Sequence, residues 1–120
     1  MVEPFEILEN SFSQYIGVKH SVTTVNGTAS LHLAFAGKEY KKGSEVIVPE
    51  FSMVATAWGP YYAGLVPVPV DCTYSMNIDS SKIESRINDN TVAILITHVY
   101  GRVCNMQAIV DLCNKYCIGS

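Results

Sequence analysis

The chain has 120 residues, of which 48% are hydrophobic and 16% charged, and its formal net charge at pH 7 is −3. This composition is typical of a globular domain with a buried core and excludes an intrinsically disordered chain. Because the Lys and Arg residues are scattered, no apolar run is long enough for a bilayer and the N-terminus is acidic, we expect a cytoplasmic protein with no nucleic-acid or membrane partner.

The first two elements are predicted from apolar spacing. Phe5, Leu8 and Phe12 recur every three or four positions between polar residues, which predicts an amphipathic helix that ends at Gly17. The β-branched run from Val22 to Val25 then predicts a buried strand.

The next segment is a turn followed by a helix. Asn26-Gly27 tolerates positive φ and predicts a sharp turn, and Thr28 to Ala36 predicts an apolar helix. The first N–H groups of a helix are unpaired and its dipole favours anions, so this turn, with the hydroxyl of Ser30 close by, is a candidate phosphate site. A plain turn with a hydroxyl N-cap accounts for the same residues equally well.

The middle of the chain predicts two strands and a helix. One strand runs from Glu45 to Val48, and the other from Val66 to Val70, where two prolines favour a sheet edge or pairing through alternate residues. Between them, we expect a helix that is capped by Ser52, kinked or restarted at Pro60 and stopped at Gly64.

Three further elements are predicted toward the C-terminus. Asp79 is expected to cap a short helix that reaches Ile87, and Val92 to Thr97 is the clearest buried strand in the chain. The last helix is predicted from about Asn105 to Tyr116.

Strands that alternate with helices predict an α/β fold around a mostly parallel sheet. Ligands of such sheets bind beyond the carboxyl ends of the strands, so the candidate site comprises residues 26–28, 49–53 and 98–101. The glycine signatures of dinucleotide-binding and P-loop proteins are both missing from the sequence.

The cysteines and histidines show no metal-ligand pattern. The cysteines include no Cys-x-x-Cys pair, and the three histidines lie in separate segments. We therefore expect no metal ion, and free thiols in a reducing compartment.

The turn-helix segment and several later blocks resemble a known family. One sequence block of the DegT/DnrJ/StrS sugar aminotransferases, which are pyridoxal-phosphate enzymes of fold type I, resembles the segment Asn26-Gly27-Thr28-Ala29-Ser30-Leu31-His32-Leu33-Ala34. Each later block is weak alone, but their order and spacing extend the resemblance over nearly the whole chain. They are Glu45–Pro49, Val54–Ala57, Tyr62–Gly64 with Val70-Asp71, Asn77–Asp79, Thr91–Ile94 and His98–Gly101.

The resemblance implies a fold and a cofactor site. Residues 1–120 would form a single partial domain, the N-terminal portion of an aspartate aminotransferase-like large domain of fold type I. Gly27, Thr28 and Ala29 would bind the phosphate of pyridoxal phosphate. The family's ring-stacking aromatic residue falls at Met53, whose thioether can pack on a ring. The nearby aromatics Phe51 and Trp58 are assigned to the core.

His98 and Tyr100 are candidates for substrate binding, because they follow a buried strand and should face the same crevice. The alternative for His98 is a purely structural histidine.

The family's chemistry also needs a Schiff-base lysine and an acid beside the pyridine nitrogen. The family's blocks for both residues are not found in this sequence, so no catalytic residue is nominated and the 120-residue chain alone is expected to be inactive. The resemblance implies part of a homodimeric aminotransferase that uses a nucleotide-linked keto sugar and an amino donor such as glutamate. The alternatives are a non-catalytic binding or dimerisation module with this fold, and an unrelated small phosphate-binding α/β protein.

Overall fold

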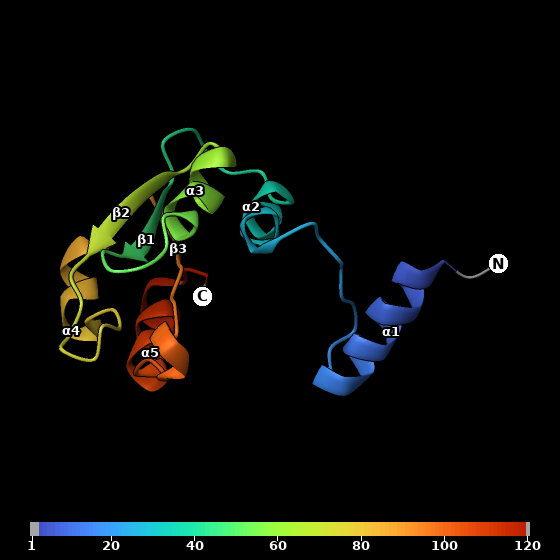
Figure 1. Ribbon diagram of the computed structural model, residues 1–120. Helices are drawn as coiled ribbons and strands as arrows, with labels where there is room; N and C mark the ends of the chain where they lie inside the picture. The colour runs from blue at the N-terminus through green and yellow to red at the C-terminus, as the bar shows by residue number, and fades with distance from the viewer. Residues whose placement is uncertain (1–2, 120) are drawn as a thin grey trace.

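The structure, a computed structural model, describes residues 3–119 (Figure 1). Its elements, in chain order, are α1 Pro4–Ile16, α2 Gly27–Ala36, β1 Glu45–Pro49, α3 Ala55–Tyr62, β2 Val66–Val70, α4 Ser80–Ile83, the 3-10 turn η1 Glu84–Arg86, β3 Thr91–Ile94, the 3-10 turn η2 Val99–Gly101 and α5 Met106–Tyr116. None of the helices within this range is both long and apolar enough to cross a membrane.

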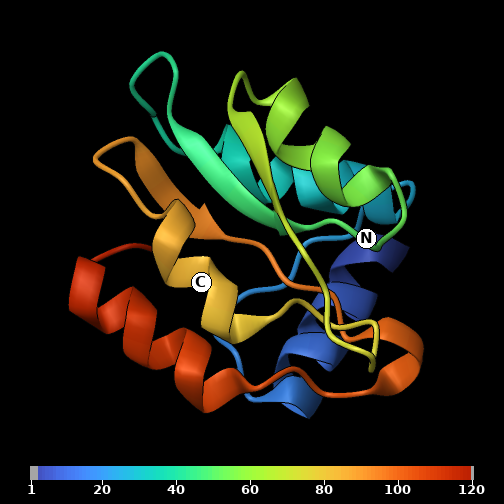
Figure 2. The ribbon, with the colours of Figure 1, turned by 90° about the vertical axis from the view of Figure 1, so that its left-hand side faces the viewer.

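The three strands form one parallel sheet in the order β2-β1-β3. Helices α2 and α3 lie on one side of this sheet, and α4 and α5 lie on the other (Figure 2). This arrangement confirms the predicted α/β architecture, in which helical crossovers join parallel strands.

The central strand β1 is buried on both faces. Ile47 is completely buried among residues of α4 and α5, including Ile83 and Ile109. Its neighbours Val46 and Val48 point to the opposite face and pack in the cluster that contains Phe35 of α2. Because successive side chains of a strand alternate between faces, one continuous apolar run supplies both halves of the core.

Strand β2 accommodates its prolines by pairing through alternate residues, as predicted. The Val66 N–H donates to the Ser44 carbonyl (2.9 Å), and the Glu50 N–H donates to the Val70 carbonyl (2.9 Å). Pro67 and Pro69 lie between these pairing positions, opposite Val46 and Val48 in the register. Their missing N–H groups therefore remove no hydrogen bond between β2 and β1.

The predicted strand from Val22 to Val25 is wrong. The segment is an extended linker, and Val25 is 91% exposed. No neighbouring strand within residues 3–119 pairs with it, and β-branched residues form a stable strand only where a sheet receives them. Instead, Thr23 binds back to α1 by donating from its N–H and its hydroxyl to Glu9 Oε1 (2.7 and 2.9 Å).

Two further expectations about helix starts and breaks are wrong. Gly27 is not a positive-φ turn residue but the first residue of α2, preceded by the extended N-cap Asn26 (φ −168°). Helix α3 begins at Ala55 rather than after Ser52, and it is not restarted at Pro60, which lies inside it. A proline there removes only one backbone donor from a short helix that is held by packing against α2. The expected stop at Gly64, which has φ +80°, is confirmed.

The last predicted strand is shorter than expected. Strand β3 ends at Ile94. The Leu95 N–H still donates to the Ile47 carbonyl (2.8 Å), and the chain leaves the sheet after this bond. The hydroxyl of Thr97 then bonds to a side chain across the cavity described below. The short helix after Asp79 and the final helix lie close to their predicted positions, with Asp79 and Asn105 as their N-caps.

Helix α3 approaches α2 at a glycine. A Cβ on Gly59 would lie 2.6 Å from Leu31 Cβ and 3.0 Å from the Leu31 carbonyl carbon. No real side chain fits at such distances, so the two helices pack at a separation that only glycine allows at this position.

We therefore predict that Gly59→Ala destabilises the fold. Alanine favours a helix interior by about 1 kcal/mol over glycine, but overpacking against Leu31 should cost about 1–3 kcal/mol and outweigh that gain. Gly37→Ala is the matched control, because Gly37 has φ −79° and an added Cβ would meet nothing within 4 Å. Chemical denaturation of both variants checks this; equal midpoints would contradict it.

Helix α1 leaves an apolar face uncovered. It stands apart from the sheet (Figure 1), and Phe5, Leu8 and Phe12 are each more than half exposed. Large contiguous apolar surfaces are typical of protein–protein contacts or of association.

We predict that the isolated 120-residue chain associates in solution because of this face. Sedimentation velocity should show species heavier than the 13.2 kDa monomer. Replacing Phe5 and Phe12 together by Ser should reduce association, whereas Tyr74→Ser, at a fully exposed position away from α1, should not. A monodisperse wild-type monomer would contradict the prediction.

Candidate functional site

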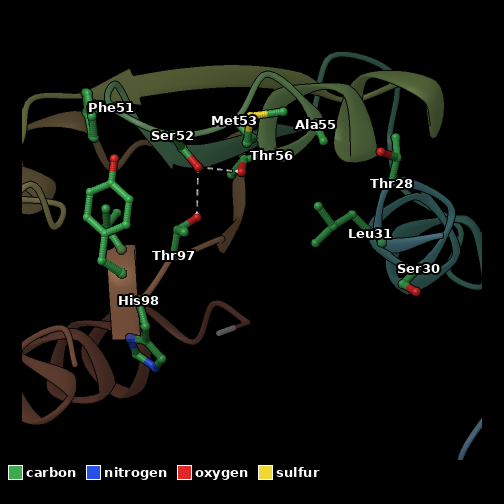
Figure 3. A pocket seen from close by; sticks show the side chains of 13 residues that line it. Thr28, Ser30, Leu31, Phe51, Ser52, Met53, Ala55, Thr56, Thr97 and His98 are labelled. Atoms are coloured by element: carbon green, nitrogen blue, oxygen red, sulfur yellow. Dashed lines mark hydrogen bonds between the residues drawn. The ribbon is translucent and has the colours of Figure 1, made fainter. Parts of the chain in front are cut away.

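A cavity of about 750 Å³ lies where the three predicted loops meet (Figure 3). The start of α2, the loop after β1 and the segment after β3 line it, as expected for the carboxyl edge of a parallel sheet. The lining residues are Gly27, Thr28, Ser30, Leu31, Phe51, Ser52, Met53, Ala55, Thr56, Thr97, His98, Val99 and Tyr100.

The start of α2 contributes unpaired backbone donors. Asn26 Oδ1 accepts the Ala29 N–H (2.9 Å), so the helix has a side-chain N-cap. Within residues 3–119, the N–H groups of Gly27 and Thr28 have no such partner. The Thr28 side chain lies on the side of α2 that faces Met53 and Ala55 (Figure 3).

The three residues predicted to hold a phosphate are thus placed differently. Gly27 and Thr28 line the cavity, whereas Ala29 does not and its N–H is engaged by the cap. A Cβ on Gly27 would meet no protein atom within 4 Å, so its backbone borders open space. Ser30 lines the cavity, but its hydroxyl bonds to Thr24 and to the Asn26 carbonyl. The helix is thus capped by the Asn26 amide and not by the expected hydroxyl, and its first two N–H groups remain without a partner beside the cavity.

The loop after β1 supplies apolar surface to the cavity. Met53 lines it and is 76% exposed, which leaves its thioether accessible. Phe51 also lines the cavity at 49% exposure, so its assignment to the core is wrong. The core assignment of Trp58 is wrong as well: it is 45% exposed and its ring lies against Tyr62 (6.2 Å between centroids), because α3 covers the sheet with its opposite side.

Three hydroxyl groups meet in the cavity opposite the start of α2. Ser52 Oγ lies 2.7 Å from Thr56 Oγ1 and 3.1 Å from Thr97 Oγ1 (Figure 3). These residues come from the loop after β1, the first turn of α3 and the segment after β3. The trio therefore joins three elements at one point of the cavity wall.

The segment after β3 is fixed by a buried amide. Asn77, only 5% exposed, accepts the Val99 N–H at Oδ1 (3.1 Å) and donates from Nδ2 to the Arg102 carbonyl (2.9 Å). These two bonds bracket Tyr100, which has the left-handed conformation (φ +52°) and an exposed ring. Asn77 is thus the residue that positions this wall.

The side chain of His98 is also held by a hydrogen bond from the backbone. Its Nδ1 accepts the Cys104 N–H (3.2 Å), which leaves Nε2 as the protonated ring nitrogen of a neutral imidazole. In Figure 3 the ring points away from the hydroxyl trio. This geometry supports the structural alternative for His98, although the residue does line the cavity.

The cavity wall carries no formal charge. Among the described residues, none of those lining the cavity is Lys, Arg, Asp or Glu. An anion here would be held by neutral donors and by the dipole of α2. Nearby, burial raises the pKa of the Cys104 thiol, with a smaller contribution from Cys72. Within residues 3–119, no group of three or more His, Cys, Asp or Glu side chains is arranged to hold a metal ion.

Comparison with known proteins identifies the family. The model of the DegT/DnrJ/EryC1/StrS aminotransferase family matches residues 3–119. The chain belongs to this family. A GDP-perosamine synthase of Caulobacter vibrioides is 38% identical to it over 109 residues, which are 90% of this chain and 29% of that relative.

Solved structures agree with this assignment to the DegT/DnrJ/EryC1/StrS family. DesV of S. venezuelae, in complex with a ketimine intermediate, superposes with a TM-score of 0.90 at 29% identity, over 98% of this chain and 32% of that one. NtdA of Bacillus subtilis, with bound cofactor PMP, gives 0.85 at 33% identity, over 98% of this chain and 28% of that one. The chain thus has the fold of these aminotransferases and spans about a third of their length or less.

Sequence reasoning found the three loops but missed several of their polar residues. Thr56 and Thr97 carried only the signals of a helix interior and a strand end, and Ser52 was expected to cap a helix. In the sequence, Asn77 stands out only as part of a block that resembles the family. A polar residue at the end of an otherwise apolar strand, such as Thr97, was the one signal that could have singled out the trio.

We predict that Asn77→Ala destabilises the cavity wall, because it leaves the buried Val99 N–H and Arg102 carbonyl without their partner. The expected loss of unfolding free energy is about 1–3 kcal/mol. Asn88→Ala is the control: Asn88 also makes two side-chain bonds, to Glu45 and to the Asn90 N–H, but in an exposed turn. Chemical denaturation checks both variants, and equal losses would contradict the special role of Asn77.

Proposed function

We propose that this chain is part of an aminotransferase that uses pyridoxal phosphate to transfer an amino group to a keto sugar carried on a nucleotide. Family membership supports the reaction class. The nucleotide sugar is supported by the GDP-perosamine synthase relative, and the cofactor by the PMP-bound relative. The observation in this chain that carries the proposal is the pair of unpaired N–H groups at Gly27 and Thr28, which border an open cavity.

The residues of the cavity fit such a cofactor. The N–H groups of Gly27 and Thr28 and the Thr28 hydroxyl would hold the phosphate, helped by the dipole of α2. Ala29 would join them only if its N–H were released from the Asn26 cap. Met53 would lie against one face of the ring, where a thioether packs favourably. When bound, pyridoxal phosphate supplies the electron sink of the reaction.

His98 and Tyr100 remain our proposed substrate contacts, at the opposite wall from α2. His98 would contribute its Nε2–H as a donor, since its Nδ1 is engaged by the Cys104 N–H. Tyr100 would contribute an exposed phenol ring. A sugar ring offers many oxygen acceptors and donors for such groups.

The remaining features of the proposal concern the whole protein. We propose that residues 1–120 form one partial domain, that glutamate or a similar amino acid is the amino donor, and that the protein is a cytoplasmic homodimer. The free thiols of Cys72, Cys104 and Cys117 are consistent with a reducing compartment. The uncovered apolar face of α1 is consistent with a protein–protein contact.

A non-catalytic binding module is the second candidate function. The residues that line the cavity in the described part of the chain include no lysine, which is compatible with either function. The genomic sequence that follows residue 120 distinguishes the two. We expect it to encode an acid for the pyridine nitrogen and a later lysine, and a stop codon with neither would favour the binding module.

We predict that Thr28→Val weakens binding of pyridoxamine 5′-phosphate about tenfold, because a hydroxyl bond to a charged group is lost in a side chain of nearly the same shape. Thr28→Ser, which keeps the hydroxyl, should bind like the wild type. Gly27→Val should also weaken binding, since its side chain would fill the space beside the backbone donors. Equilibrium dialysis measures all three, and unchanged affinity in Thr28→Val and Gly27→Val would remove this turn from the site.

We predict no transamination by the purified 120-residue chain with a GDP-linked keto sugar and glutamate. A phosphate cradle binds ground state and transition state alike, so it cannot replace the lysine that the reaction needs. Borohydride trapping with pyridoxal phosphate, followed by peptide mapping, should label several surface lysines such as Lys41 and Lys42. One uniquely labelled lysine together with turnover would contradict this prediction.

A further inference from the structure

The hydroxyl trio of Ser52, Thr56 and Thr97 has a hydrogen left over. Three hydroxyl groups carry three protons, and the two bonds within the trio use two of them. This count holds whichever way the bonds point. Within residues 3–119, no other acceptor bonds to any of the three hydroxyls, so one O–H donor has no acceptor and is the unspent donor of the trio.

The position of the unspent donor follows from burial. Thr56 is 7% exposed, and a free donor on its hydroxyl would be buried without a partner, which is costly. Ser52 and Thr97 are partly exposed and line the cavity. The orientations that leave the proton on Ser52 or Thr97 are therefore favoured, and both present it to the cavity.

The cavity wall between the trio and α2 is apolar. In Figure 3, Met53 and Ala55 lie between the trio and Thr28, and Leu31 faces them from α2. A ligand that spans this distance would meet polar donors at its two ends and apolar surface along its body. A flat ring with a phosphate at one end and an acceptor atom at the other has this pattern.

We propose that the Ser52–Thr56–Thr97 trio is a second anchor of the cavity, which donates one hydrogen bond to an oxygen or nitrogen acceptor on the ring of a phosphorylated aromatic ligand. The position of the phosphate at α2 rests on the proposed function. The trio deepens that proposal by assigning the opposite end of the ligand. Because the Ser52–Thr97 bond can run in either direction while Thr56 donates to Ser52, the trio can present its donor from Ser52 or from Thr97 as the ligand requires.

The test uses three probes that separate the two ends. Pyridoxamine 5′-phosphate carries ring and phosphate, pyridoxamine only the ring, and inorganic phosphate only the anion; none has an aldehyde to react with surface lysines. In Thr97→Val, affinity for both ring-containing probes should fall about tenfold, while affinity for phosphate stays unchanged. In Thr28→Val, affinity for the two phosphate-containing probes should fall, while affinity for pyridoxamine stays unchanged.

Two controls accompany this pair. Thr97→Ser keeps the hydroxyl and should restore wild-type affinity for every probe. Ser85→Ala removes a hydroxyl that donates to the Lys82 carbonyl (2.9 Å) at an exposed position outside the cavity, and it should change no affinity. Circular dichroism checks the folding of each variant, and Ser52→Ala, with the same expected result, replaces Thr97→Val if that variant does not fold.

The outcomes are distinguishable. Wild-type affinity for both ring probes in Thr97→Val, or an equal loss for all three probes, would overturn the trio as an anchor and leave the proposed function standing. Failure of the wild-type chain to bind pyridoxamine 5′-phosphate would overturn the cofactor site, and the trio with it. Selective loss of the ring probes, restored by Thr97→Ser, would support the inference.

Discussion

The contact between α2 and α3 is the constraint on which the cavity depends. Helix α2 follows a linker that joins no strand of the sheet, so no ladder of backbone bonds fixes where it begins. Its place is set by packing against α3, at the close approach of Gly59 to Leu31, and by Phe35, which anchors its far end in the core. The unpaired N–H groups at the start of α2 therefore face the loop after β1 because of side-chain packing rather than sheet topology.

Because no charged residue in the described part of the chain lines the cavity, an anion would be recognised there by hydrogen bonds from neutral groups. Neutral N–H and O–H donors hold an anion without a salt bridge, and they hold it by direction as much as by charge. The two polar groups of the wall, the start of α2 and the hydroxyl trio, come from four separate segments of the chain. Their relative position is thus a property of the folded domain, and Asn77 extends this rigidity to the segment that carries His98 and Tyr100.

Much of the fold could be predicted because local signals agreed with the tertiary structure. The apolar run of β1, the alternate pairing of β2 and the cap at Asp79 needed no long-range information. The strand at Val22–Val25 failed because strand propensity is realised only beside a partner strand. The three loops of the site followed from the parallel-sheet rule, but the trio could not be predicted, since hydroxyls 45 residues apart meet only once the strands have their register.

The two edges of the sheet differ in their ability to accept another strand. Since Val66 and Val70 pair with β1, the backbone nitrogens of Pro67 and Pro69 face outward, and neither carries a hydrogen. This outer edge of β2 offers carbonyls without donors, so it is a poor template for strand addition and is protected from edge-to-edge aggregation. The outer edge of β3 is different, because Gly119 already exchanges backbone bonds with it, donating to Val92 and accepting from Ile94 (3.0 and 2.9 Å). A sheet that grows beyond these three strands can therefore grow in one direction, away from the prolines.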